Sequence, residues 1–191
     1  MKPVHVLVFD GLADWEIGLV TFELHTRNGI DLRTVGFGKE NIKTGGGLTI
    51  VPDLELSQMD LDNVGLIILP GGDIWHHLAN GELQEAVVQL HRKGVPVAAI
   101  CGATLFLAKV GILKEGMRHT SNSVDYLSKN VTEYAEQALY VDEYAIGDRN
   151  VITASGVASI EFTYEILKML RVYDEAGLAE FAEFWQCRKK R

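Results

Sequence analysis

Short runs of consecutive apolar residues alternate along this chain with longer segments in which apolar residues recur every three or four positions. The short runs have the length of strands, and their continuous apolar character is typical of strands covered on both faces. They lie at residues 5–9, 32–37, 65–69 and 95–100. The longer segments have the periodicity of amphipathic helices and lie at residues 16–27, 83–92, 104–111, 159–170 and 176–186. The alternation predicts an α/β fold in which a parallel sheet is sandwiched by helices.

The second half of the chain is less regular. Residues 139–146 and 150–154 are predicted to be two strands joined by Gly147-Asp148-Arg149. Ser159 is predicted to be the N-cap of the helix that follows them. The chain has 191 residues and shows neither an internal repeat nor a linker, so we expect residues 1–191 to form a single domain.

The net charge of the chain argues against some classes of binding partner. Eighteen basic and 26 acidic residues give a net charge of −8. This balance argues against nucleic-acid binding, which usually requires a basic face. The basic cluster Arg188-Lys189-Lys190-Arg191 is expected to be a solvated tail. No apolar run is long enough to span a bilayer. We therefore expect a small-molecule substrate rather than a nucleic acid or a membrane.

The two cysteines, Cys101 and Cys187, are far apart and have no CxxC or histidine-rich spacing. We therefore expect neither a disulfide framework nor a metal site. We also expect no cofactor. The amino-terminal segment runs directly into a predicted strand and lacks the apolar core and cleavage site of a signal peptide. We expect a cytoplasmic protein.

Residues 95–111 contain the most informative pattern in the chain. An apolar strand pattern passes through Cys101-Gly102-Ala103 directly into a helical pattern, which requires a sharp turn at the junction. This is the geometry of a nucleophile elbow, with a thiol as the nucleophile. The following helix points its amino-terminal N–H groups toward the sulfur, which favours a thiolate with a pKa below the usual value of about 8.5. The alternative is a buried structural cysteine.

Carboxylates that follow the first strand are expected at the same edge of the sheet as Cys101, because ligands and functional groups gather outside the carboxyl ends of parallel strands. Glu16 opens the first helix, and Asp14 is its nearby competitor. Either could exchange a proton with the thiol. The alternative is a carboxylate that only complements the helix dipole.

The segment after the third strand is predicted to line the same edge. Gly71 and Gly72 would let backbone N–H groups approach a ligand closely, and the Gly72 and Gly102 N–H groups could form an oxyanion hole. Asp73, Trp75 and His76 follow directly and are candidates for the wall of a pocket. A plain strand-ending turn and a packed indole are the alternatives.

Few histidines in the chain could serve as a base for the thiol. A Cys-His-acid arrangement needs an imidazole near the elbow, and only His76, His77 and His119 lie in segments that could reach it. Among these, His119 is predicted to be the catalytic histidine. His76 and His77 are unsuited as a metal pair, because adjacent helical residues point in different directions.

The chain resembles the ThiJ/PfpI superfamily, whose members have the flavodoxin-like fold of class I glutamine amidotransferases. The resemblance rests on four motifs: FDGLADWEIG at residues 9–18, LPGG at 69–72, AICGAT at 99–104 and VITASGVASIEFTYEIL at 151–167. It implies that Cys101 is the reactive thiol, Glu16 its hydrogen-bonded partner, and Gly72 and Gly102 the oxyanion donors. It also implies a homodimer.

The sequence departs from several family patterns. PfpI-type peptidases have a histidine directly after the nucleophile, whereas this chain has Gly102, and glutaminase triads have a late His-x-Glu where this chain has Ala154-Ser155-Gly156. Where many relatives place a histidine, this chain has Asn122. The resemblance implies a cysteine-dependent hydrolase or lyase of a small carbonyl or amide compound, similar to glyoxalases and deglycases. A stress-linked redox sensor or chaperone with an oxidisable Cys101 is the alternative, and a glutaminase is the second alternative.

Overall fold

The computed structural model describes residues 1–114 and 116–190, and within them a seven-stranded sheet has the order β5-β2-β1-β6-β7-β9-β8. Strands β1, β2, β5, β6, β7 and β9 are parallel, and β8 pairs with β9 in the antiparallel sense. The strands are β1 Val4–Val8, β2 Leu32–Gly36, β5 Leu54–Glu55, β6 Leu66–Leu69, β7 Val97–Ile100, β8 Ala145–Asp148 and β9 Val151–Ala154. A separate hairpin pairs β3 Ile42–Lys43 with β4 Thr49–Ile50.

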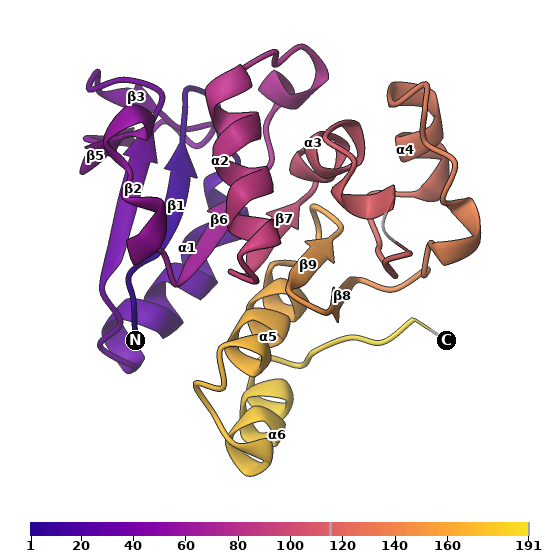
Figure 1. The fold of residues 1–191 in the computed structure, drawn as a ribbon. Coiled ribbons are helices and arrows are strands. Elements are labelled where there is room, and N and C mark those ends of the chain that lie inside the picture. Colours follow the sequence, from indigo (N-terminus) through magenta and orange to yellow (C-terminus); the bar gives the residue numbers. More distant parts are fainter. Residues whose placement is uncertain (115, 191) are drawn as a thin grey trace.

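Helices cover both faces of the sheet, as the sequence predicts. Figure 1 shows α2 crossing in front of the strands and α1 behind them. The helices are α1 Asp14–Thr21, α2 Gly81–Arg92, α3 Ala103–Lys109, α4 Val124–Asn130, α5 Ser159–Met169 and α6 Glu175–Phe184. Helix α1 continues as a π-helical segment, η1 Phe22–Arg27. Short 3₁₀ turns are η2 Leu56–Gln58, η3 Leu61–Asn63, η4 Asp73–His76, η5 Ile112–Lys114 and η6 Gln137–Leu139.

The core is centred on strands β1, β6 and β7. Every residue of these three strands is buried, which explains why their sequences are continuous apolar runs rather than alternating patterns. The strand order reverses at β1, because β2 lies on one side of it and β6 on the other. The loops after β1 and β6 therefore diverge and leave a crevice at their carboxyl ends. No helix in the part of the chain that the model describes is long and apolar enough to cross a membrane.

Two sequence predictions about local structure are wrong. Residues 139–146 do not form one strand: residue 139 ends η6, and β8 begins only at Ala145 because its register is set by pairing with β9. The turn between β8 and β9 falls at Arg149, whose φ is +52°. Ser159 is the first residue of α5, and Ala158 holds the N-cap position without a side-chain hydrogen bond.

The basic tail is not solvated as expected. Arg188 makes an ion pair with Glu161 and Lys190 with Asp142, so the segment is docked on the body of the protein. In Figure 1 the yellow carboxyl-terminal segment runs past α5 and below β8. Glu161 on α5 and Asp142 in the segment before β8 explain the difference, and their position could not be known from composition. Arg191 lies outside the described residues.

Candidate active site

Cys101 occupies a sharp turn between β7 and α3, at the junction where the sequence predicts one. Its φ of +59° lies in the left-handed region, which a residue with a side chain rarely adopts and which raises the energy by about 1–3 kcal/mol. Its N–H donates to Ala154 O of the neighbouring strand at 2.9 Å. A Cβ on Gly102 would lie 2.9 Å from Gly72 O and 3.0 Å from Trp75 Cδ1, so the turn has no space for a larger residue. The strained turn therefore presents the thiol at the sheet edge.

Glu16, and not Asp14, is the carboxylate that meets the thiol. Glu16 is fully buried, and its Oε2 accepts a hydrogen bond from the Gly71 N–H at 2.6 Å. Its Oε1 is buried beside the thiol but makes no hydrogen bond of ordinary length among the described residues. Asp14 instead accepts hydrogen bonds from the Thr44 hydroxyl and the Gly46 N–H, and so holds the loop of the β3–β4 hairpin.

Cys101 and Glu16 both have pKa values above those of exposed groups of the same kind. Burial raises the pKa of Glu16 to about 7, although the Gly71 N–H and the thiol lower it. Burial, followed by the negative charge of Glu16, raises the pKa of Cys101 to about 11. The prediction of a low thiol pKa is therefore wrong, because desolvation outweighs the N–H group of Gly102. Above neutral pH one proton remains with the pair.

Asn122 and Gly156 complete the immediate surroundings of the sulfur. Asn122 Nδ2 lies 3.5 Å from Cys101 Sγ, and Asn122 Oδ1 accepts from the Gly156 N–H at 2.9 Å. A Cβ on Gly156 would lie 2.7 Å from Sγ and 3.1 Å from Glu16 Oε1. The backbone at Gly156 therefore packs directly against both the thiol and the Glu16 carboxyl group. This role for Gly156 was not predicted, although it lies in the loop after the last parallel strand.

The glycines after β6 have different roles. Gly72 and Gly102 border the same cavity as the thiol, which is the position required of oxyanion donors. The Gly71 N–H is occupied by Glu16, so Gly71 positions the carboxylate. A Cβ on Gly71 would lie 2.6 Å from Glu16 Oε2 and 2.7 Å from Cys101 Cβ, which explains the glycine.

The cavity over the thiol has a volume of about 280 Å³. Asp73 and His76 line it as predicted, but Trp75 does not, because its indole is fully buried and donates to Pro70 O. The aromatic wall consists of Trp15 and Tyr126, which the sequence did not identify. The cavity is lined by Gly11, Ala13, Trp15, Glu16, Gly72, Asp73, His76, Cys101, Gly102 and Tyr126.

The assignment of His119 as the base is corrected by the structure. His119 is fully buried, and its two ring nitrogens bond Met117 O at 2.8 Å and the Tyr134 hydroxyl at 2.7 Å. It is therefore a satisfied core histidine. His76 is the histidine at the cavity, and its Nε2 lies 3.2 Å from the Tyr126 hydroxyl. His77 is exposed and does not line the cavity.

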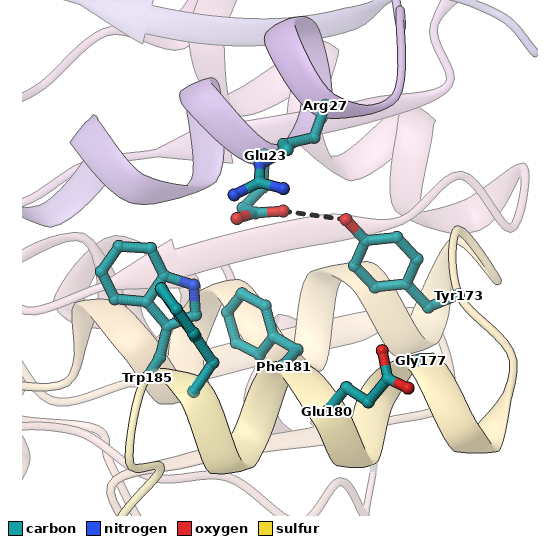
Figure 2. A pocket seen from close by; sticks show the side chains of 8 residues that line it. Glu23, Arg27, Tyr173, Gly177, Glu180, Phe181 and Trp185 are labelled. Atoms are coloured by element: carbon teal, nitrogen blue, oxygen red, sulfur yellow. Dashed lines mark hydrogen bonds between the residues drawn. The ribbon is translucent and has the colours of Figure 1, made fainter.

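A second cavity, of about 380 Å³, lies between η1 and α6 and shares no lining residue with the first (Figure 2). One of its lining residues is Glu23, which is 3% exposed and accepts a hydrogen bond from the Tyr173 hydroxyl at 2.9 Å. Asn28 Nδ2 donates to the same hydroxyl. These contacts join the end of the first helix to the segment before α6.

Replacing Tyr173 with phenylalanine is expected to lower the free energy of unfolding by about 1–3 kcal/mol, because the buried Glu23 carboxylate then loses its donor. Denaturant unfolding of the two proteins measures the difference. Activity at Cys101 should be unchanged, since the two cavities are separate. An unfolding midpoint equal to that of the wild type would show that the hydrogen bond contributes nothing.

Comparison with known proteins finds relatives that match most of this chain. A relative from Bacillus subtilis named as an uncharacterized protease, YoaZ, is 38% identical over 90% of this chain and 85% of its own length. The glutathione-independent glyoxalase DJR-1.2 of Caenorhabditis elegans is 29% identical over 80% of each chain. The crystal structure of a thiJ/pfpI family protein from Bacillus anthracis superposes with a TM-score of 0.89 at 36% identity, over 95% of this chain and 89% of that one.

The Bacillus anthracis protein has the flavodoxin-like fold of class I glutamine amidotransferases, and so does this chain. The model of the DJ-1/PfpI family matches residues 2–169, a span that includes Glu16, Gly71, Cys101 and Gly156. The chain therefore belongs to the DJ-1/PfpI family.

Proposed function

We propose that this protein is a cysteine-dependent hydrolase or lyase that acts on a small carbonyl or amide compound, as glyoxalases and deglycases do. One observation supports the proposal above all: the strained Cys101 and the buried Glu16 share the floor of one small cavity. A pKa of about 7 allows Glu16 to accept and return a proton near neutral pH, as general acid–base catalysis requires.

The first step is addition of the sulfur to the substrate. When a carbonyl carbon approaches Sγ, the thiol proton passes to Glu16, the S–C bond forms and the π electron pair moves to the oxygen. Gly72 and Gly102 line the cavity, and their N–H groups are the donors that this step assigns to that oxygen. With an amide, Glu16 returns the proton to the leaving amine, the C–N bond breaks and the acyl group stays on Cys101 as a thioester. With a 2-oxoaldehyde, the oxygen takes the proton to give a hemithioacetal, and the C1–H proton then moves to C2 through an enediol, so that C1 is oxidised, C2 is reduced and a 2-hydroxyacyl thioester results. Water releases any thioester from Cys101.

The size of the cavity favours a small substrate over a peptide. A volume of about 280 Å³ with Trp15 and Tyr126 as walls suits a compound of a few carbon atoms. Relatives include proteins named as proteases and as a glyoxalase, so their names leave the substrate open. Gly102, in place of the histidine that follows the nucleophile in PfpI-type peptidases, supports the carbonyl compound.

The wild-type protein should be assayed against three probes: a 2-oxoaldehyde, a small primary amide and a fluorogenic peptide. We expect turnover of the 2-oxoaldehyde, together with a mass adduct on the peptide that contains Cys101 and none on the peptide that contains Cys187. Turnover of the peptide probe with none of the aldehyde would reject a small carbonyl substrate. Absence of turnover on all three would reject the enzymatic proposal.

The pH dependence of the reaction follows from the raised pKa of Glu16. Only the ionised carboxylate can take the thiol proton, so kcat/KM should rise with pH through about 7 and then level off. Glu16→Gln keeps an acceptor for the Gly71 N–H but cannot take a proton, so its profile should lack this rise. Initial rates over a pH series measure both. A wild-type profile without an inflection near neutral pH contradicts the role of Glu16.

The second candidate is a redox sensor. It is favoured by the hydrogen-bonding groups of Asn122, Gly102 and Glu16, which surround the sulfur and could bind the oxygens of a sulfinate. The raised pKa of Cys101 weighs against it, because thiolate is the form that peroxide oxidises. Mass spectrometry of peroxide-treated protein separates the candidates: selective dioxidation of Cys101 in a protein without turnover supports the sensor.

A further inference from the structure

The docked tail makes several contacts through one side chain, Arg188. Its Nε and Nη2 donate to the two carboxylate oxygens of Glu161 at 3.0 and 3.2 Å, and its backbone N–H donates to the same carboxylate at 2.7 Å. Nη2 also donates to Val157 O at 2.5 Å. The guanidinium carbon lies 4.2 Å from the centre of the Tyr144 ring. Arg188 therefore joins three segments of the chain: the tail itself, the segment that contains Tyr144, and residues 157–161.

Two of these segments border the active-site loop. Val157 directly follows Gly156, and the Tyr144 carbonyl accepts a hydrogen bond from the Ser155 N–H at 2.9 Å. Arg188 thus contacts the loop directly at Val157 and, through Tyr144, indirectly at Ser155. The Val157 side chain is 68% exposed, so packing of that side chain does not hold the residue in place. Its carbonyl is instead bound by the guanidinium group of Arg188, and the turn is closed by the Ala158 N–H, which donates to Ser155 O at 2.9 Å.

The position of Gly156 determines the geometry at the sulfur. Its backbone leaves no space for a Cβ beside Cys101 Sγ and Glu16 Oε1. Its N–H holds the amide of Asn122, whose Nδ2 faces the sulfur. A shift of the loop would therefore admit water to the buried pair and move Asn122 away from it.

We infer that Arg188 is a positioning residue for the reaction at Cys101: by binding Val157 O and Glu161 it fixes Gly156 against the thiol. Arg188 does not line the cavity and does not touch the reacting groups. Its effect on turnover rests on the proposed function, but its effect on the thiol does not. The sequence could not indicate this role, because Arg188 lies 32 residues beyond Gly156 in a segment that composition describes only as basic.

The test compares Arg188→Ala and Arg188→Lys with Lys190→Ala. Lysine keeps the charge, but a single ammonium group cannot bind both Glu161 oxygens and Val157 O in the fork geometry of arginine. Lys190→Ala removes the ion pair with Asp142 and the contact of the ammonium group with the Tyr144 ring, 5.3 Å away, but no contact with Glu161 or residues 155–158. It therefore controls for general loosening of the tail and for loss of a cation beside Tyr144. All variants are assayed well below their thermal unfolding midpoints, measured by circular dichroism.

The readout that needs no turnover is alkylation of Cys101 by iodoacetamide as a function of pH, followed on the Cys101 peptide by mass spectrometry. Water that reaches the pair relieves the desolvation of the thiol, so the alkylation midpoint of Arg188→Ala should move to lower pH. Arg188→Lys should lie between Arg188→Ala and the wild type. Lys190→Ala should match the wild type.

The second readout is steady-state kinetics with the 2-oxoaldehyde. We expect kcat of Arg188→Ala to fall by about tenfold to a hundredfold, with KM within about twofold of the wild type, because catalytic geometry is lost and cavity contacts are kept. If the wild type turns over no probe, the alkylation midpoint still tests the role of Arg188. A midpoint in both Arg188 variants that equals that of Lys190→Ala overturns the inference. If Arg188→Ala does not fold, Arg188→Lys decides by the same criterion.

Discussion

Replacing Cys101 with serine is expected to lower turnover of a 2-oxoaldehyde by about a thousandfold or more. The hydroxyl group is far less acidic than the thiol, and the buried site offers Glu16 as the acceptor for its proton. A carboxyl group with a pKa of about 7 can take a proton from a thiol during attack, but not at a useful rate from an alcohol. Initial rates at fixed substrate concentration measure the loss.

Cys187→Ser is the matched control, because Cys187 is also half-buried and has a raised pKa of about 11 but lies outside the active-site cavity. It should keep the wild-type rate. A Cys101→Ser protein that turns over substrate as fast as the wild type would remove the thiol from the mechanism, and with it the proposed function.

The second large effect is expected for Gly156→Ala. The added methyl group would lie 2.7 Å from Cys101 Sγ, closer than Cβ atoms approach in real structures, and a tight 3.0 Å from Cys101 Cβ, so either the loop or the thiol must move. Displacement of a reacting group by about 1 Å can reduce turnover by about a hundredfold. We therefore expect a loss of kcat of this order, with a smaller effect on the thermal unfolding midpoint.

Gly18→Ala is the control for Gly156→Ala. Gly18 lies inside α1 with nothing within 4 Å of an added Cβ, so the change should raise helix stability by about 0.5–1 kcal/mol and leave turnover unchanged. Thermal unfolding and initial rates of both variants form one experiment. Full activity in Gly156→Ala would show that the loop does not pack against the thiol as the structure places it.

Local patterns predict the scaffold of this site well. The apolar run before Cys101 and the helical pattern after it require a sharp turn, and the structure contains one, with a positive φ at Cys101. Glu16 could be placed at the same sheet edge because both residues follow parallel strands. The choice between Glu16 and Asp14 needed the structure, since it depends on the Gly71 N–H and on the hairpin that binds Asp14.

Properties set by burial and by distant contacts could not be predicted. The helix after Cys101 indicated a low thiol pKa, but desolvation and the charge of Glu16 raise it. His119 is in the right part of the sequence for a base, yet Tyr134 and the Met117 carbonyl use its ring nitrogens inside the core. Arg188 acts on a loop far away in sequence, so no local pattern indicates it.

The position of Trp15 gives the protein a built-in optical probe. Its indole is 63% exposed at the mouth of the cavity, and its Nε1 donates to Gly156 O at 3.4 Å. Trp75 is sealed in the core and Trp185 lines the other cavity, so a compound that enters above Cys101 changes the polarity around Trp15 first. Fluorescence emission can therefore report occupancy without a label, even for compounds that are never converted.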